Sequence, residues 1–598
     1  MQTSNTCAAM YNKPALHSFH IPVMGVAYTI DSPLRVAEYG ISSVISLVDD
    51  LLMEKMRELY SKKFELPFSP ISSSDIDARA KRITSYLNMI DTIVKAKVDE
   101  LLSKKSKVDL RRFSELLPNT STIKLELNRV IENKTNSTKE FWNKLKENLT
   151  SGLIDVNIMT KVDKENYHNG EKLSEEYNDA HAALRGFAQS SLTSSIVLSA
   201  GMNPKLYGYI ESFEDFYPNA NFELKKKVTL KVSDFRSALI QGKFLAKKGI
   251  WVSEYRIESG LNCGGHAFAS DGLLLGPILQ EFADNREVLI SSNFQIYAKA
   301  LADKGKFIPP TPPELKISVQ GGVGTHEEHQ MLIDKYKVDS VGWGSPFLLV
   351  KEATCVDDET RKRLVDARED DLYLSNISPL GVMFNNLRGS SKEQERDMLI
   401  AKGKPGSYCP KRYLALNKEF SERGECTASI SFIKKKVEEL KGKNLPQAEF
   451  DKEYKKITEK SCLCIGLVTS AFIEHGIEGG KDYNGITACP GPNTAYFTKE
   501  ATLKEMVGHI YGTNNVIERT DRPHMFIKEL MLYVKYLKDR IAESPAEANT
   551  KEAKFFTTFK ENLQKGIAYY KSFFTEATKE GKQSLERLLN IEKEVGSI

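Results

Sequence analysis

The sequence has no long uninterrupted apolar run. Of its 598 residues, 41% are hydrophobic and 27% are charged, yet no stretch approaches the ~18 consecutive apolar residues of a transmembrane helix. The first residues, Met1 to Cys7, also lack the basic patch and apolar core of a signal peptide. These absences predict a cytoplasmic protein that does not bind a membrane.

An excess of charge of one sign is missing as well. The chain has 84 Lys and Arg against 80 Asp and Glu, a net charge of +4, which is too small at this length to indicate nucleic acid. The lysine-rich segments of residues 50–150 have helical periodicity and are interpreted as solvated helix faces. The length exceeds that of one ordinary domain, so two or three folding units are expected.

Cysteine is sparse. Eight cysteines are too few for a disulfide scaffold in a chain of this length, and without a secretion signal a reduced setting is expected. Five of them fall between 409 and 489, and Cys409 and Cys489 each precede a proline. A [4Fe–4S] cluster or a zinc ion held by Cys409, Cys462, Cys464 and Cys489, with Cys426 as an alternative, is one interpretation. Buried thiols without a metal are the other, because the spacing matches no compact ferredoxin signature.

Strand and helix patterns alternate over the first 350 residues. Alternation of this kind predicts a parallel sheet, and eight strands predict a closed (β/α)₈ barrel, or TIM barrel, of the α/β class. The predicted strands are residues 20–25, 41–48, 154–161, 205–211, 227–232, 250–257, 317–320 and 338–341.

The barrel is predicted to carry a large helical insertion and a mostly helical C-terminal extension. Residues 1–49 and 151–355 form the predicted barrel, and residues 50–150 form the insertion. Residues 356–498 comprise an extended cover segment and the cysteine-containing region, and residues 499–598 are helical. Aromatic residues from Phe555 to Phe574 recur at helical spacing, which is typical of core packing.

Two glycine turns end successive predicted strands. Gly-Gly-Val-Gly-Thr occupies 321–325, and Gly-Trp-Gly-Ser occupies 342–345. Glycine lets the backbone approach a ligand closely, and Thr325 is placed to cap a helix over 326–336 whose free N–H groups suit a phosphate. A barrel commonly binds phosphate after its seventh and eighth strands. We therefore predict a phosphate site formed by Gly322, Gly324, Thr325, Gly342, Gly344 and Ser345; tight strand–helix packing is the alternative for either turn alone.

His266 is the best candidate for acid/base chemistry. It follows Gly264 and Gly265 at the end of the predicted strand 250–257, where barrel active sites lie. Its imidazole suits general-base catalysis, whereas a loop histidine with a structural hydrogen bond is the alternative. Lys161 and Lys231 are candidates to face the cofactor or an anionic substrate, or else solvent. Gln320 is a candidate to hydrogen-bond a ligand at this turn, or else to stabilise its own turn.

These segments resemble a known family. Gly-Gly-Val-Gly-Thr, the following helix, Val-Gly-Trp-Gly-Ser-Pro-Phe (341–347) and Gly-Gly-His (264–266) are similar to the flavin site of the nitronate monooxygenase (2-nitropropane dioxygenase) family. This group of FMN-dependent TIM-barrel oxidoreductases includes flavin-dependent enoyl-ACP reductases. The resemblance covers about residues 18–48 and 150–355.

The resemblance implies a flavoprotein monooxygenase or reductase that binds FMN, with His266 as the base over the flavin. The residues it places around the cofactor, beyond the phosphate set, are Met24, Gly25, Lys161, Gly264, Gly265, Gln320 and Gly321. This chain has Asn262-Cys263 where members of the family commonly have Glu-Ala, a difference that bears on the substrate. A small-molecule or acyl substrate, NAD(P)H as electron donor and an oligomeric state are compatible with this interpretation.

Two other functions compete with it. An FMN barrel acting on RNA, like a dihydrouridine synthase, is disfavoured because the sequence has no Asn-x-Gly-Cys-Pro segment. A non-catalytic scaffold with a relic barrel would bind no flavin.

Overall fold

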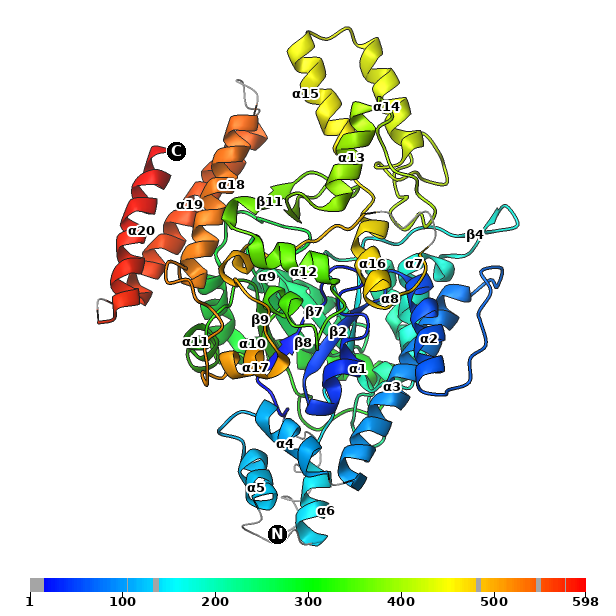
Figure 1. The fold of residues 1–598 in the computed structure, drawn as a ribbon, viewed down its shortest axis with the longest axis vertical. Coiled ribbons are helices and arrows are strands. Elements are labelled where there is room, and N and C mark those ends of the chain that lie inside the picture. Colours follow the sequence, from blue (N-terminus) through cyan, green and yellow to red (C-terminus); the bar gives the residue numbers. More distant parts are fainter. Residues whose placement is uncertain are drawn as a thin grey trace.

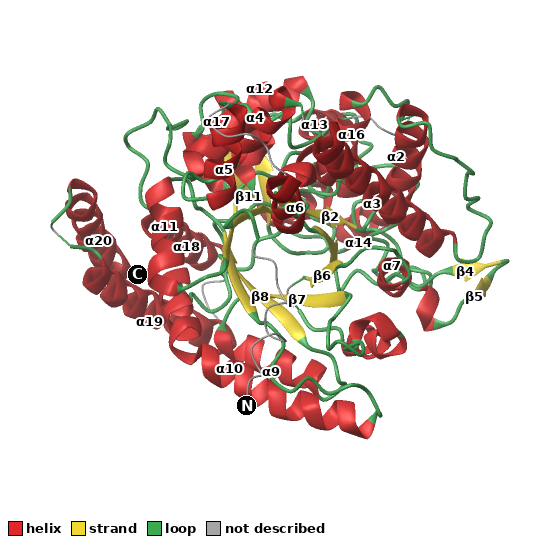
Figure 2. Ribbon diagram, turned by 90° about the horizontal axis from the view of Figure 1, so that it is seen from below, coloured by secondary structure: helices red, strands yellow, loops and turns green. Residues whose placement is uncertain are grey.

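The centre of the molecule is a closed barrel of eight parallel strands in the order β1-β10-β9-β8-β7-β6-β3-β2. The computed structural model describes residues 15–104, 106–132, 139–199, 201–479, 485–544, 550–575 and 577–598. Figure 2 looks along the ring of strands and shows helices outside it. The predicted (β/α)₈ fold is confirmed. The strands are β1 (Phe19–Ile21), β2 (Ser42–Ser46), β3 (Ile154–Ile158), β6 (Ser194–Leu198), β7 (Lys226–Val232), β8 (Val252–Glu258), β9 (Lys316–Gln320) and β10 (Ser340–Gly342).

Helices join successive strands on the outside of the barrel. Their first turns are capped by the chain itself: Asp49 accepts the N–H of Leu52, and Asp234 accepts the N–H of Ser237, as residues of this type do at helix starts. The barrel helices are α1 (Ser32–Val36), α2 (Asp50–Lys63), α3 (Ala78–Lys104), α7 (Asp179–Ala188), α8 (Pro204–Tyr209), α9 (Phe235–Ala246), α10 (Leu275–Asp303), α11 (His326–Tyr336) and α12 (Asp358–Asp366).

The fourth strand differs from its prediction. Residues 205–211 do not form a strand: they belong to α8 and a short 3₁₀ helix, whereas the strand is Ser194–Leu198. The sequence signal for the helix is Asn203 followed by Pro204, because Asn203 caps the helix and proline fits its first turn. The strand Ser-Ser-Ile-Val-Leu is buried at every position. A continuously buried strand lacks the alternation that distinguishes a strand from a helix.

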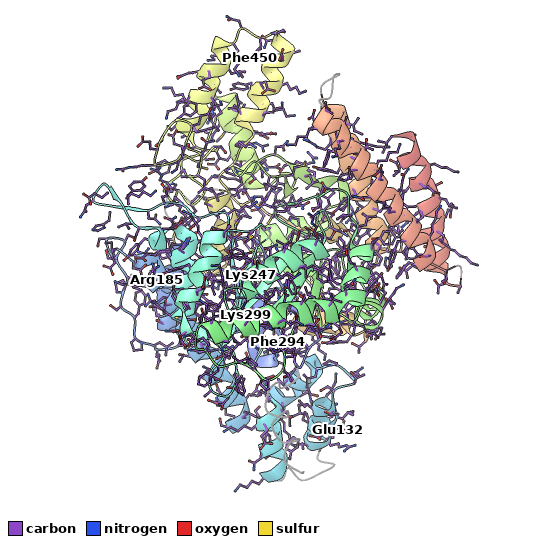
Figure 3. The ribbon with its side chains drawn as sticks, turned by 180° about the vertical axis from the view of Figure 1, so that it is seen from behind. Glu132, Arg185, Lys247, Phe294, Lys299 and Phe450 are labelled. Atoms are coloured by element: carbon purple, nitrogen blue, oxygen red, sulfur yellow. The ribbon has the colours of Figure 1, made fainter. Side chains whose placement is uncertain are left out.

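The additions to the barrel lie at opposite ends of the molecule. Between α3 and β3 the chain forms α4 (Lys107–Leu116), α5 (Thr122–Ile131) and α6 (Lys139–Asn148), at the lower end in Figure 1. The hairpin of α14 (Ile430–Gly442) and α15 (Gln447–Thr458) lies at the upper end. In Figure 3, Glu132 beyond α5 and Phe450 on α15 mark these two ends.

The chain beyond residue 370 covers one end of the barrel and one side. The predicted extended segment 371–389 is an antiparallel hairpin of β11 (Leu372–Ser375) and β12 (Phe384–Leu387). In the C-terminal helices, Phe559 and Tyr570 are fully buried, and the Tyr570 ring stacks on Phe526 at 5.1 Å. A small hairpin, β4 (Tyr167–His168) and β5 (Glu171–Lys172), precedes α7. The remaining helices are α13 (Ser391–Ala401), α16 (Leu463–Glu474), α17 (Leu503–Ile510), α18 (Met525–Glu543), α19 (Thr550–Phe573) and α20 (Lys579–Ser597).

Within the described part of the chain, each helix is either too short or too polar to cross a lipid bilayer.

Several histidines are buried in this fold as neutral rings. Burial lowers the pKa of His17, His329 and His524 to about 4 and that of His20 to about 3. His329 illustrates the reason, because its Nδ1 accepts the indole N–H of Trp343, and a protonated ring has no lone pair to accept with.

We expect the free energy of unfolding to fall by about 3–5 kcal/mol between pH 7 and pH 5. Below pH 6.5 these histidines take up protons in the unfolded chain but not in the folded one, so stability is lost as pH falls towards their folded pKa. Asp155 and Glu529, whose pKa values burial raises to about 6 and about 7, oppose this trend only partly. Urea titrations at the two pH values measure the difference, and equal stabilities would contradict the account.

Candidate functional site

A cavity of about 600 Å³ lies at the carboxyl ends of the barrel strands. All eight strands contribute to it, because in a parallel barrel every strand ends at the same rim. Its volume is typical of small-molecule and cofactor sites. The residues it receives from the strand ends, in chain order, are Pro22, Ser46, Asn157, Ser199, Lys231, Glu258, Gln320 and Gly342.

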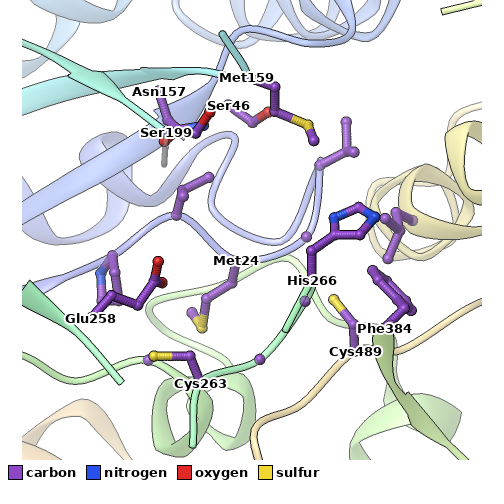
Figure 4. Close-up of a pocket in the computed structure, with 18 of the residues that line it drawn as sticks. Met24, Ser46, Asn157, Met159, Ser199, Glu258, Cys263, His266, Phe384 and Cys489 are labelled. Atoms are coloured by element: carbon purple, nitrogen blue, oxygen red, sulfur yellow. The ribbon is translucent and has the colours of Figure 1, made fainter. Parts of the chain in front are cut away.

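Most of the site residues predicted from sequence line this cavity, some of which Figure 4 shows. His266 is among them, at the end of β8 and against Phe384 of the cover hairpin. The others are Met24, Gly25, Lys161, Gly264, Gly265, Gln320, Gly321, Gly322, Gly342, Gly344 and Ser345.

Gly324 and Thr325 belong to the predicted phosphate site but do not line the cavity. The N-terminus of α11 is occupied by the chain itself. The Thr325 side chain accepts the N–H of Glu328, and the Glu328 carboxylate accepts the N–H of Gly324 at 2.8 Å. Glu328 is 1% exposed and pairs with the Arg522 guanidinium at 2.8 Å. This carboxylate holds the position at the helix N-terminus that an external anion would otherwise occupy.

The turn after β9 presents backbone to the cavity and requires glycine. Gly322 has a φ of +83°, and a Cβ there would lie 2.0 Å from Nδ2 of Asn262. The N–H groups of Gly322, Val323 and Gly344 donate to no partner within the described ranges. Donors left free at two neighbouring turns form a concave surface suited to an anion.

The wall beneath the cavity is polar and incompletely paired. Lys231 Nζ lies 2.8 Å from Glu258 Oε2, and the Gln320 amide donates to Glu258 Oε1 at 2.7 Å. Three amide oxygens of residues lining the cavity, those of Asn157, Asn262 and Gln320, are buried without a hydrogen-bond partner. Because buried polar atoms are nearly always paired, these oxygens indicate a ligand that offers hydrogen-bond donors.

The imidazole of His266 is half-buried and bridges the barrel and its cover. Its Nε2 is hydrogen-bonded to Ser378 Oγ at 2.7 Å, and its ring meets that of Phe384 edge-on at 5.0 Å. Burial first, and the charge of Lys231 second, lower its pKa to about 4. The ring is therefore neutral near pH 7 and able to accept a proton.

Sequence reasoning missed several polar residues of the cavity. Asn157 and Ser46 are register partners near the ends of β3 and β2, and Figure 4 shows them on the same side of the pocket as Ser199. The available signal was a polar residue at one of the last positions of a strand, Ser46 at the end of β2 and Asn157 next to the end of β3. No local signal predicted Asn493 or Leu414, because they come from segments distant in sequence that fold over the barrel rim.

The cysteines divide into two groups. Cys489 lines the cavity, and its carbonyl oxygen accepts the N–H of Gly265 at 3.1 Å. Cys426 lies with Cys409, Cys462 and Cys464 in a separate cluster, packed against Leu414 and its neighbours. The fourth cysteine of this cluster is therefore Cys426, which the sequence indicated only as the alternative ligand, and not Cys489.

Comparisons with known proteins concern the fold alone. No protein-family model matches the sequence, and no curated protein matches it. FabK from Thermotoga maritima is similar in structure, with a TM-score of 0.35 and 11% identity over 88% of this chain and 96% of that chain. The enoyl reductase domain of MlnA, from the macrolactin biosynthesis cluster of Bacillus amyloliquefaciens, has a TM-score of 0.34 and 13% identity over 62% of this chain and 83% of that chain.

Proposed function

We propose that the protein is an FMN-dependent oxidoreductase of the nitronate monooxygenase/enoyl reductase type. The observation that carries the proposal is the cavity at the strand ends, which has free backbone N–H groups on one wall and unpaired amide oxygens on another. A molecule with a phosphate at one end and a polar ring edge at the other complements both. FMN has this combination of groups.

The two glycine turns would hold the phosphate. Gly322, Val323 and Gly344 offer backbone N–H groups, and Ser345 offers a hydroxyl. Ser345 Oγ accepts the N–H of Gly491 at 2.7 Å, which leaves its own hydrogen available to donate. The sequence predicted that the N-terminus of α11 binds the phosphate. The groups named here would bind it instead, because the Glu328 carboxylate already occupies that helix end.

The polar wall would orient the ring system. The unpaired oxygens of Asn157 and Gln320 would accept hydrogen bonds from ring N–H groups, and Lys231 would place a cation beside the ring. A bound flavin would supply hydride and electron transfer, and the protein supplies position, electrostatics and proton transfer.

His266 would move the substrate proton. Its Nε2 is held by Ser378, which leaves Nδ1 as the ring nitrogen without a partner among the described residues. A neutral imidazole fixed in this way serves as an acid/base for a small-molecule or acyl substrate. Met24, Leu380 and Phe384 provide apolar surface for the remainder of such a substrate, and NAD(P)H is the proposed electron donor. A [4Fe–4S] cluster, the second predicted cofactor, would bind outside this cavity.

Freshly purified, untagged protein is expected to show flavin absorption bands, with about one FMN released per chain on denaturation. Anaerobic addition of NADH or NADPH is expected to bleach the bands and so identify the donor. Colourless protein that takes up no added FMN would overturn the proposal and favour the scaffold function.

A pair of glycine variants strengthens this test. Gly322→Ala puts a Cβ 2.0 Å from Asn262 at a positive φ, so FMN affinity is expected to fall at least about tenfold. Gly442→Ala, at the exposed end of α14 with no atom outside its own stretch of helix within 4 Å of the new Cβ, is the control and should bind FMN as the unmodified protein does.

A further inference from the structure

We infer that Cys409, Cys426, Cys462 and Cys464 are the ligands of a [4Fe–4S] cluster next to the cavity. The inference specifies the second cofactor of the proposed function, but it stands on the cysteines alone and does not require that FMN binds. Four cysteine thiolates are the usual ligand set of such a cluster.

The four thiols converge from three separate segments. Cys409 lies in the loop after α13, Cys426 lies just before α14, and Cys462 and Cys464 lie at the start of α16. Cys409 contacts both Cys426 and Cys462, and Cys462 contacts Cys464. Within the ranges that the structure describes, the other cysteines, Cys263, Cys355 and Cys489, lie outside this cluster.

Backbone groups stabilise two of the four sulfurs as ligands. Cys462 is the N-cap of α16, where the helix dipole stabilises negative charge. Backbone N–H groups of residue 465 and of residues 428–429 donate to the sulfurs of Cys462 and Cys426. Hydrogen bonds from N–H groups to sulfur are also a means by which proteins tune iron–sulfur clusters.

The spacing of the sulfurs does not match the ligand set of a single zinc ion. Zinc holds its four sulfurs at about 2.3 Å from one centre, so they lie under about 4 Å apart. No three of these thiols lie mutually within 4.8 Å, since among the described residues only Asp31, Cys355 and His475 form such a group. A proline follows Cys409, as it follows a ligand cysteine in ferredoxin-type iron–sulfur sequences, and this neighbour favours a cluster.

The compact group of Asp31, Cys355 and His475 is not a competing metal site. The Asp31 carboxylate pairs with the Arg35 guanidinium at 2.9 Å and with the His475 ring at 3.0 Å. It also accepts the hydroxyl of Tyr60 at 2.6 Å. Its charge is matched by protein groups, so a cation would have to displace Arg35.

The cysteine cluster adjoins the cavity directly. Val162, Leu414 and Leu416 pack on the thiols and also line the cavity. Asn417 and Thr427, in the loop between Cys409 and Cys426 and just beyond it, line the cavity as well. A cluster bound by these cysteines would therefore fix part of the cavity roof, and its loss should loosen residues 409–427.

The test is metal analysis of the full-length protein purified without oxygen. About four irons and four acid-labile sulfides per chain are expected, with a broad absorption shoulder near 400 nm that dithionite bleaches. Zinc in place of iron, or metal-free protein with its thiols free or in disulfides, would overturn the inference. A protein with the cluster but no FMN would refute the proposed function alone.

Two matched serine variants identify the ligands. Cys426→Ser is expected to lose at least about half of the bound iron, whereas Cys489→Ser, an equally buried cysteine at the cavity, should retain it. If Cys426→Ser does not fold, Cys409→Ser, at a half-buried position, gives the same measurement. Iron loss in Cys489→Ser with retention in Cys426→Ser would refute this ligand set.

Discussion

Replacement of His266 by alanine is expected to lower kcat about 10²–10⁴-fold while leaving FMN binding intact. The imidazole is the proposed acid/base group at the cavity wall, held by Ser378 and Phe384, and alanine leaves nothing at that position to exchange a proton. Steady-state turnover with a nitronate and with an enoyl thioester measures the effect, with the flavin spectrum reporting on cofactor binding.

Ser378→Ala is the matched control, because it removes the hydrogen bond to Nε2 but keeps the imidazole. We expect it to change kcat less than tenfold. The unmodified enzyme should keep its rate between pH 6 and 8 and lose it as pH falls towards the lowered pKa of about 4, where the base is protonated. Unchanged kcat in His266→Ala would assign this histidine a purely structural hydrogen bond.

Replacement of Arg522 by methionine is expected to reduce the free energy of unfolding by about 3–5 kcal/mol. Arg522 binds both carboxylate oxygens of Glu328 at 2.8 Å, and Glu328 is 1% exposed. Without the guanidinium, the carboxylate keeps, among the described residues, only its N–H bonds from Gly324 and Met525 and remains a buried charge without a counterion. Urea unfolding monitored by circular dichroism measures the loss.

Two comparisons separate charge from packing. The double variant Arg522→Met/Glu328→Gln removes both charges and is expected to recover a substantial part of the stability. Lys535→Met breaks an exposed ion pair with Asp539 on α18 and should cost less than about 1 kcal/mol. A double variant as unstable as Arg522→Met would show that packing, not the buried charge, is responsible.

The barrel was predictable because its signals are local. Each predicted strand except the fourth overlaps an observed one, since strand periodicity, glycine turns and helix caps act over a few residues. The fourth failed because Ser194–Leu198 is buried on both faces, so it has no alternation, and the helical pattern before it extended across the strand.

The candidate site was predictable only where it belongs to the barrel. His266, Gly322 and Gly344 follow strand ends, and topology brings every such end to one rim. Gly324 and Thr325 have the same local pattern, yet Glu328 and Arg522 occupy that helix end. Arg522 comes from almost 200 residues away, and no local pattern encodes that contact.

The sequence by itself determined the barrel, its glycine turns and the position of the histidine, because these depend on periodicity, backbone freedom and chain order. Only the tertiary structure decided which groups face the cavity and which cysteines meet. Cys426 and Cys489 are equivalent as residues, but the first packs beside Cys409 and the second lies against Gly265. Which cysteine joins the cluster is decided by the packing of the cover segment on the barrel. The free energy of that packing depends on the apolar area buried and on the pairing of buried polar groups between segments distant in sequence.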